Sequence, residues 1–209
     1  MIRKNTGKSA LKLGFLASHG GSSMLAILDA IAAGELHAEA RILIANNADC
    51  AAATAAAAAG VPCRHISATT EGGAETADRA IAEAMTAAGA ELIVLSGYMR
   101  KLGPETLAHF KGRVLNIHPA LLPKHGGQGL YGRRVHEAVR ASGDTVSGAS
   151  IHVVEADYDT GPVISRREVP VRPEDSVQDI EASVRAIEPG LFVETLRRIA
   201  DGELVLPSP

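Results

Sequence analysis

Apolar residues follow two different spacings along the first half of the chain. Apolar runs of four to eight residues are typical of buried strands, whereas apolar positions that recur every three or four residues are typical of helices that cover a sheet. The short runs predict four strands, at 11–18, 38–46, 63–67 and 91–97. The second spacing, or a strong excess of alanine, predicts three intervening helices, at 20–34, 48–60 and 75–89. This alternation indicates a parallel sheet wound with helices.

The pattern changes after Arg113, where helices no longer separate every pair of strands. The expected order is a strand at 114–118, a long Gly- and Pro-rich loop at 119–132 and a helix at 133–142. Two strands joined by an acidic turn follow, at 146–155 and 161–171, and a last helix at 175–202. Two strands with a short turn between them form an antiparallel pair. We therefore expect an α/β fold with a Rossmann-like, mostly parallel sheet, helices on both of its faces, and a C-terminal antiparallel strand pair.

Ten residues without a strong pattern precede the first strand, and no internal repeat or linker divides the rest. We expect residues 1–10 to form a flexible arm, and residues 11–209 to form a single domain with two halves, 11–112 and 113–209. The chain of 209 residues is long enough to bury a sizeable core. Because aromatic residues make up 3% of the sequence and alanine is abundant, that core is expected to be aliphatic.

Charge and cysteine content argue against several classes of protein. The chain has 21 Lys and Arg against 24 Asp and Glu, a net charge of −3, which does not favour binding to nucleic acid or to a membrane surface. It contains no run of 18 apolar residues, so no transmembrane helix is expected. Without a recognisable signal peptide, we expect Cys50 and Cys63 to be reduced and the protein to be cytoplasmic.

A stretch of small residues, Ser18–Ser23 (SHGGSS), joins the first predicted strand to the first predicted helix. The N–H groups at the start of a helix, together with the helix dipole, form a site suited to a phosphate. The stretch does not match a dinucleotide fingerprint, because its two glycines are adjacent and the second strand ends in Asn46-Asn47 rather than in an acid. A monophosphate therefore fits better than NAD, and the alternative is a glycine-rich turn without a ligand.

Polar groups end the strand predicted at 114–118, where Asn116 and His118 lie two residues apart and share one face. An amide and an imidazole at the carboxyl edge of a parallel sheet can both contact one small electrophile. Asp157 and Asp159 lie in the acidic turn, and a carboxylate beside a histidine favours the charged ring. The alternatives are a structural histidine with a capping asparagine, and an ordinary Asp- and Gly-containing turn.

The histidines do not have the spacing of a metal site. The candidates are His118, His125, His136 and His152, which match no zinc motif, and no cysteine pair supports them. We expect no metal.

Several segments, taken in order, resemble the folate-dependent formyltransferases. They are SHGGSSMLAILDA, VLSGYMRKLGPE, LNIHPALLPKHGG and SGASIHVVEADYDTGPVI. The resemblance covers roughly Leu11–Leu204, and the combination of NIHPALLP with DTGPVI about forty residues later is specific. Within the family the segments are most similar to the branch that formylates phosphoribosylglycinamide in purine biosynthesis. The resemblance implies the formyltransferase fold, with a phosphate-binding half at 11–112 and a catalytic and folate-binding half at 113–209.

The resemblance also implies roles for single residues. Asn116, His118 and Asp159 correspond to the catalytic residues of the family, and His152 to a supporting histidine. Glu188 corresponds to a glutamate near the acceptor amine. The substrate phosphate is expected on Gly21, Ser22 and Ser23, and the folate on Met99, Arg100, Leu102, Asn116, Val154, Glu155, Asp157 and Asp159.

The implied reaction moves a formyl group from 10-formyltetrahydrofolate, the co-substrate, to the amine of 5′-phosphoribosylglycinamide. The amine attacks the formyl carbon directly, and Asn116 and a protonated His118 stabilise the oxyanion. Asp159 is expected to keep His118 charged and to assist proton transfer. The partners are small molecules, with no nucleic acid and no membrane, and the protein is expected to be a monomer or a homodimer.

Two alternatives share the same core. One is a folate-dependent formyltransferase for another amine, such as an amino sugar, because residues 124–134 form a longer loop than in many relatives and Ser23 replaces an asparagine. The other is a formyltetrahydrofolate hydrolase, in which water takes the place of the amine.

Overall fold

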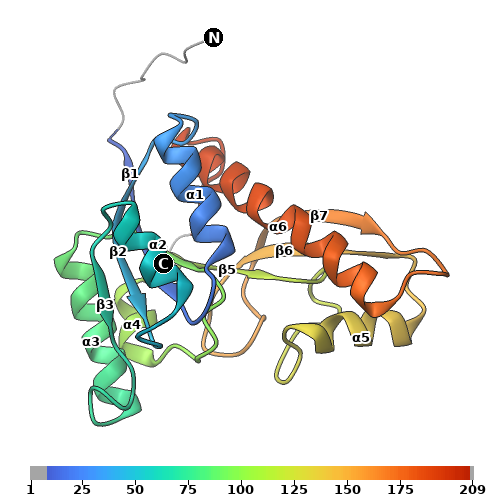
Figure 1. Ribbon diagram of the computed structural model, residues 1–209, viewed down its shortest axis with the longest axis horizontal. Helices are drawn as coiled ribbons and strands as arrows, with labels where there is room; N and C mark the ends of the chain where they lie inside the picture. Colours follow the sequence, from blue (N-terminus) through green and yellow to red (C-terminus); the bar gives the residue numbers. More distant parts are fainter. Residues whose placement is uncertain (1–8, 208–209) are drawn as a thin grey trace.

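One seven-stranded sheet runs through the molecule, in the strand order β3-β2-β1-β4-β5-β6-β7 (Figure 1). The computed structural model describes residues 9–207, so most of the arm expected at 1–10 lies outside the described residues. The strands are β1 (Leu11–Ala17), β2 (Ala38–Ala45), β3 (Cys63–His65), β4 (Leu92–Leu95), β5 (Val114–His118), β6 (Val146–Val153) and β7 (Val163–Pro170). The helices are α1 (Ser22–Ala32), α2 (Ala51–Ala58), α3 (Ala74–Ala87), α4 (Pro104–His109), α5 (Arg133–Ser142) and α6 (Val177–Ala200).

One strand, β6, runs opposite to all the others in the sheet. Strands β1 to β5 pair in parallel, whereas β6 pairs antiparallel with β5, and β7 antiparallel with β6. This confirms the predicted mostly parallel sheet with a C-terminal antiparallel pair. Because the carboxyl ends of the five parallel strands meet at one edge, the loops that follow them gather there, which is where α/β folds bind ligands.

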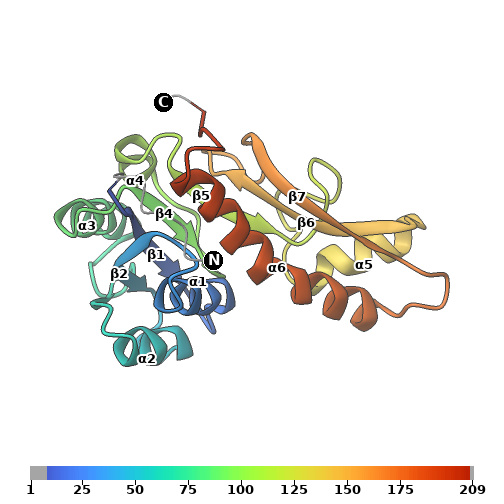
Figure 2. The same cartoon turned by 90° about the horizontal axis from the view of Figure 1, so that it is seen from above.

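Two apolar layers cover the faces of the sheet, as Figure 2 shows from above. Leu13 and Phe15 of β1 point into the layer formed with α1, α2 and α6, whereas Leu16 points into the layer formed with α3. This alternation follows from the period of two in a strand. Both layers are mainly aliphatic, as the composition predicted.

Helix α4 is the one element that the hydrophobic pattern did not predict. It has six residues, too few for a clear period of 3.6, and it begins with Pro104 followed by Glu105. A proline and an acidic residue in the first turn are helix-start signals, so its beginning was detectable from the sequence. The other elements lie within one to three residues of the predicted ends, because helix and strand ends are the least regular part of each element.

The alanine run forms α2, which packs against the start of α1. Gly21 has a left-handed backbone with φ of 66°, and a Cβ placed on it would lie 2.9 Å from the Cβ of Ala52. The Ala52 amide also donates a hydrogen bond to the His19 carbonyl at 3.0 Å. The loop at 18–23 therefore rests directly on an alanine.

Helix α6 continues through Pro189, as predicted. It begins at Ser176, whose side chain accepts from the Asp179 amide while the Asp179 side chain accepts from Ser176, which is a capping box. A proline inside a helix removes one hydrogen bond. Here Val184 and Phe192, both fully buried, anchor the helix on either side of Pro189.

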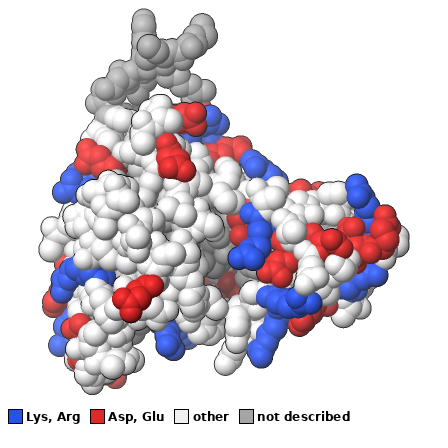
Figure 3. Space-filling view, viewed as in Figure 1, with Lys and Arg blue, Asp and Glu red and all other residues white. Residues whose placement is uncertain are grey.

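The surface differs between the two halves of the molecule. Figure 3 shows that charged side chains crowd the half around α5 and α6, with both signs interspersed, whereas the surface over α1 and α2 carries few of them. This face therefore shows no continuous basic patch. Within residues 9–207, no helix is both long and apolar enough to cross a bilayer.

Candidate active site

Four polar side chains meet at the carboxyl edge of the sheet, beside the place where strand direction changes. Asn116 and His118 lie on β5, and His152 of β6 lies directly opposite Asn116 in the antiparallel register. Asp159 comes from the turn between β6 and β7 and has a left-handed backbone with φ of 58°, a conformation that aspartate tolerates better than most residues. Each of these residues was a candidate from the sequence, and the structure places them together.

Asp159 lies between the two histidines. Its Oδ2 is 3.4 Å from His118 Nδ1, and its Oδ1 is 3.4 Å from His152 Nε2. Asn116 Nδ2 lies 3.1 Å from His152 Nε2. The side chains of His118 and His152 are 4% and 2% exposed and that of Asp159 is 11% exposed, so water screens these contacts only weakly.

The charge of His118 differs from the expectation. Burial lowers the pKa of His118, and the nearby Asp159 carboxylate raises it by less. Desolvation of the imidazolium outweighs its attraction to the carboxylate, which argues against the expectation that Asp159 keeps this ring charged. Burial raises the pKa of Asp159, but the hydrogen bond with His152, the proximity of His118 and the amide of Gly127 lower it to below its usual value. At neutral pH the pair is a neutral imidazole beside a carboxylate.

The protons on the histidines follow from their neighbours. His118 Nε2 lies 2.8 Å from the carbonyl oxygen of His125, which can only accept, so Nε2 carries the proton. In the neutral ring, Nδ1 then has the lone pair and faces Asp159. His152 Nδ1 lies 3.0 Å from the Val153 carbonyl oxygen. His118 thus presents a base at Nδ1.

The loop at 18–23 lies at the amino end of α1. Within the described part of the chain, the backbone N–H groups of Ser22 and Ser23 have no hydrogen-bond acceptor, whereas the next one, that of Met24, donates to Ser96 Oγ at 2.9 Å. Free N–H groups at a helix start suit an anion. Ser22 is exposed and Ser23 is 3% exposed, so the Ser23 hydroxyl faces the interior rather than solvent.

Hydrogen bonds between neighbouring loops fix this edge of the sheet. Ser18 Oγ accepts from the Met99 amide at 2.8 Å, and Asn47 Nδ2 donates to the Ser18 carbonyl at 2.6 Å. The sequence placed Ser18 in the small-residue stretch and Asn47 at the end of a strand, but it predicted none of these contacts, because the partners lie 29 to 81 residues away. These bonds hold the loop at 18–23 next to the loop after β4.

A small cavity of about 90 Å³ opens onto Asn116, His152 and Asp159. Seven of the eight residues predicted to bind folate line it, namely Arg100, Leu102, Asn116, Val154, Glu155, Asp157 and Asp159. Met99 is the exception, because it lines neither this cavity nor its larger neighbour and is 49% exposed. Lys101 and Tyr158 also line the small cavity, and the Lys101 Nζ lies over the Tyr158 ring, 5.5 Å from its centre.

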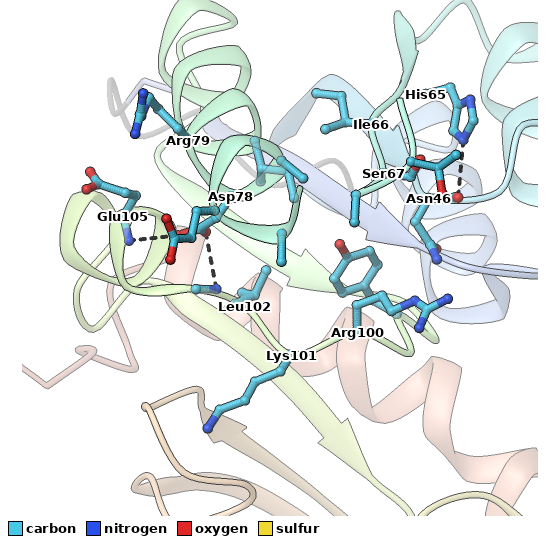
Figure 4. Close-up of a pocket in the computed structure, with 18 of the residues that line it drawn as sticks. Asn46, His65, Ile66, Ser67, Asp78, Arg79, Arg100, Lys101, Leu102 and Glu105 are labelled. Atoms are coloured by element: carbon cyan, nitrogen blue, oxygen red, sulfur yellow. Dashed lines mark hydrogen bonds between the residues drawn. The ribbon is translucent and has the colours of Figure 1, made fainter. Parts of the chain in front are cut away.

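A larger cavity of about 870 Å³ lies beyond the loop at 98–103, among the ends of β2 and β3, helix α3 and α4 (Figure 4). Ile66 and Ile81 provide apolar lining, and Asn46 carries a buried Oδ1 without a hydrogen-bond partner in the described residues. Burial raises the pKa of the Tyr98 hydroxyl to about 12, so it stays a neutral donor. Sequence reasoning did not predict this cavity.

Asp78 of α3 holds the loop that separates the two cavities. It is 6% exposed and accepts from the amides of Gly103, Glu105 and Thr106 at 3.2, 2.8 and 3.3 Å (Figure 4). These amides lie around the start of α4. Asp78, a residue of another helix, therefore caps α4. Arg100, Lys101 and Leu102, which line both cavities, owe their position to this contact.

The sequence pattern that defines the formyl transferase family matches residues 11–196. The chain belongs to the formyl transferase family. It is 34% identical over 189 residues to the phosphoribosylglycinamide formyltransferase of Escherichia coli, covering 90% of this chain and 87% of that protein. It is 32% identical to the chloroplastic enzyme of that name from Vigna unguiculata, covering 93% of this chain, and it spans 62% of that longer protein.

Solved structures of the family share the fold. Glycinamide ribonucleotide transformylase 1 of Symbiobacterium toebii superposes with a TM-score of 0.89 at 32% identity, covering 99% of this chain and 95% of that one. A formyltetrahydrofolate deformylase from Pseudomonas syringae has a TM-score of 0.84 at 21% identity, with 95% and 64% of the two chains covered, which shows the fold alone.

No group of three or more His, Cys, Asp or Glu side chains within residues 9–207 has the arrangement of a metal site. His125, one of the candidate ligands, instead contacts Asp144, and His136 is buried in α5.

Glu188 lies in α6, directly before Pro189, and burial raises its pKa to about 7. We expect Glu188→Gln to raise the free energy of unfolding at pH 8 by about 2 kcal/mol. The carboxyl has a pKa of 4.5 in the unfolded chain and about 7 in the folded one. Ionisation therefore lowers the free energy of unfolding as the pH rises between these values, and the loss is complete above pH 7. The whole pKa difference corresponds to about 3 kcal/mol. Partial exposure of the side chain reduces this free energy.

Urea unfolding at pH 8 and pH 4.5 measures this effect. The glutamine variant should match the native protein within about 0.5 kcal/mol at pH 4.5, where the folded carboxyl is protonated and the unfolded one is only half ionised. Glu35→Gln, at an exposed site, serves as the control and should change neither value. Equal gains at both pH values would contradict the buried carboxylate as the cause.

Proposed function

We propose that the chain transfers a formyl group from 10-formyltetrahydrofolate to the amine of 5′-phosphoribosylglycinamide, a step of purine biosynthesis. The observation that carries the proposal is the meeting of Asn116, His118, His152 and Asp159 between a helix-start anion site and a cavity. The names of the relatives from Escherichia coli and Symbiobacterium toebii support the same reaction and acceptor.

The acceptor is proposed to bind by its phosphate at the start of α1. The backbone N–H groups of Ser22 and Ser23, with the left-handed turn at Gly21, receive the phosphate oxygens. Because Ser23 is buried, its contribution comes from the backbone. Glu188 is proposed to lie on the amine side of the acceptor.

The folate is proposed to bind with its reactive end in the small cavity, next to Asn116 and Asp159. Formyl-folate also carries an aminobenzoyl-glutamate end, which needs space beyond this cavity. The loop at 100–102 is shared with the larger cavity, and Arg100 and Lys101 supply positive charge there for the glutamate carboxylates.

The chemistry uses the neutral His118 as a base. The acceptor amine attacks the formyl carbon, and a hydrogen bond from the Asn116 amide stabilises the oxyanion that forms. The amine loses its proton to His118 Nδ1, and Asp159, 3.4 Å away, stabilises the resulting imidazolium. The same proton then goes to the leaving folate nitrogen as the carbon–nitrogen bond breaks. No covalent enzyme intermediate is required.

A spectrophotometric assay of formyl-folate loss, with and without phosphoribosylglycinamide, tests this function. We expect loss only when the amine is present, together with one equivalent of formylated product. Loss without any amine would identify a hydrolase. Loss only with another amine, such as an amino sugar phosphate, would reassign the acceptor. The exposed Tyr131, together with Arg134 at the start of α5, would then be the first region to alter.

Two further properties are part of the proposal. We propose a cytoplasmic location, supported by the free state of Cys50 and Cys63, and small-molecule partners, with a monomeric or homodimeric assembly. We also propose that 11–112 acts as the phosphate-binding half and 113–209 as the catalytic and folate-binding half, because the start of α1 lies in the first and β5, β6 and their loops lie in the second.

A further inference from the structure

The loop between β5 and α5 contacts the His118–Asp159 pair at two backbone atoms. The carbonyl oxygen of His125 accepts from His118 Nε2 at 2.8 Å, and the amide of Gly127 donates to Asp159 Oδ2 at 2.9 Å. These two groups lie two residues apart in the loop, so one short segment contacts the pair from both ends. The conformation of this segment therefore affects both members of the pair.

His125 holds an unusual backbone conformation at this point. Its φ is 56°, in the left-handed region that residues other than glycine seldom adopt because it is energetically unfavourable. Such a conformation persists only where other contacts stabilise it. The conformation directs the carbonyl of His125 to His118, so the contacts of the His125 side chain determine whether that hydrogen bond is made.

The His125 side chain is bound to Asp144. Its Nε2 lies 2.7 Å from Asp144 Oδ2, with Ser142 Oγ at 3.5 Å. The side chains of His125 and Asp144 are 11% and 20% exposed, so the contact is only partly open to solvent. Lys124 also pairs with Asp144, but its side chain is 60% exposed. Asp144 directly follows the glycine that ends α5, so the contact connects the loop to the far end of that helix.

Two acceptors compete for the proton of the neutral His118 ring. The Asp159 carboxylate next to Nδ1 is a stronger acceptor than a carbonyl and, alone, would draw the proton to Nδ1. The His125 carbonyl favours the proton on Nε2 instead, because it lies 2.8 Å from Nε2 while the carboxylate lies 3.4 Å from Nδ1. Only this second tautomer leaves Nδ1 able to take a proton from an attacking amine.

We propose that His125 and Asp144 are positioning residues, which hold the His125 carbonyl against His118 and so keep its ring in the tautomer with a free Nδ1. Asp144 acts through His125, and neither side chain needs to touch a substrate. The catalytic consequence rests on the proposed formyl transfer, whereas the effect on the tautomer does not.

Two substitutions test the proposal. Asp144→Asn keeps the shape of the side chain and removes its charge. His125→Gly removes the anchored ring while allowing the left-handed backbone. Lys124→Gln is the matched control, because it removes the other partner of Asp144 and leaves the His125 contact in place.

The first readout is kinetic. Both variants should lower kcat for formyl transfer ~10-fold and change KM for formyl-folate less than twofold, because the defect lies in the base and not in the folate cavity. Lys124→Gln should stay within twofold of the native protein in both constants. A rise in KM with unchanged kcat would overturn the proposal, since it would mean that the loop serves binding alone.

The second readout is NMR of the full chain labelled with ¹⁵N-histidine at pH 8, with the His118 signals assigned from their loss in His118→Gln. The native protein and Lys124→Gln should show His118 protonated at Nε2, and the two anchor variants should shift it toward Nδ1. An unshifted tautomer in both anchor variants would overturn the proposal. A shifted tautomer in a protein that formylates no amine would support it while refuting the proposed function.

Discussion

Replacing His118 by alanine is expected to lower kcat for formyl transfer ~1,000-fold while leaving the dissociation constant for formyl-folate within about threefold. The ring supplies the base that takes the proton of the amine, and general-base catalysis by a positioned side chain contributes typically 10² to 10⁴ in rate. His118 does not line the small cavity, so removing it leaves the residues that would bind the folate unchanged. Single-turnover kinetics and isothermal titration with formyl-folate measure the two quantities separately.

His37→Ala provides a control for this result, because His37 is exposed and lies before β2, at the edge of the sheet opposite the site. It should keep native kcat. The native enzyme should also lose kcat/KM as pH falls below the ordinary pKa of histidine, since burial lowers the pKa of His118 and the base acts while neutral. Turnover within tenfold of native in His118→Ala would refute its role as the base.

Replacing Asp78 by alanine is expected to reduce the free energy of unfolding by about 3 kcal/mol. Three buried or half-buried amides lose their acceptor at once, and hydrogen bonds to a charged group contribute about 1.5 to 3 kcal/mol each, though not additively. For a chain of this length the melting temperature should fall by roughly 6 to 12 °C. Because the loop at 98–103 loses its support, KM for formyl-folate should rise severalfold as well.

The variant Asp78→Asn distinguishes the effect of losing the hydrogen bonds that cap α4 from the effect of losing the side chain. Its amide oxygen can still accept from Gly103 and Thr106, so the variant should lose only about 1 kcal/mol. Calorimetry and the formyl-folate assay on both variants provide the comparison. An alanine variant that melts within 1 °C of the native protein would show that water replaces the cap.

The sequence predicted most of the sheet because each strand carries its own signal. The run Val114–Leu115 followed by Asn116 and His118 identifies a buried strand that ends in polar groups on one face, and no other part of the chain is needed to see it. The turn at 156–160 can be recognised from its own residues in the same way. The turn alone did not distinguish a site from an ordinary Asp- and Gly-containing turn, and the catalytic role of Asp159 was implied by the family resemblance.

Contacts between distant segments were not predictable in this way. Asp78 looks like an ordinary polar residue in an amphipathic helix, and only the fold shows that it caps α4 from 25 residues away. His125 and Asp144 carry no motif that would pair them. The charge of His118 depends on how deeply the ring is buried, a quantity that neighbours in sequence do not determine.

The contact between Gly21 and Ala52 bears on how this chain can vary over evolutionary time. A run of alanines would ordinarily suggest relaxed selection, where one small residue replaces another without consequence. Ala52 and Ala56 are fully buried, and Ala52 supports the loop that is proposed to receive the phosphate, whereas Ala57 and Ala58 face solvent. Within this one alanine-rich stretch, some codons are therefore expected to accept almost any replacement. The codon for Ala52 is expected to accept only a change to a glycine codon.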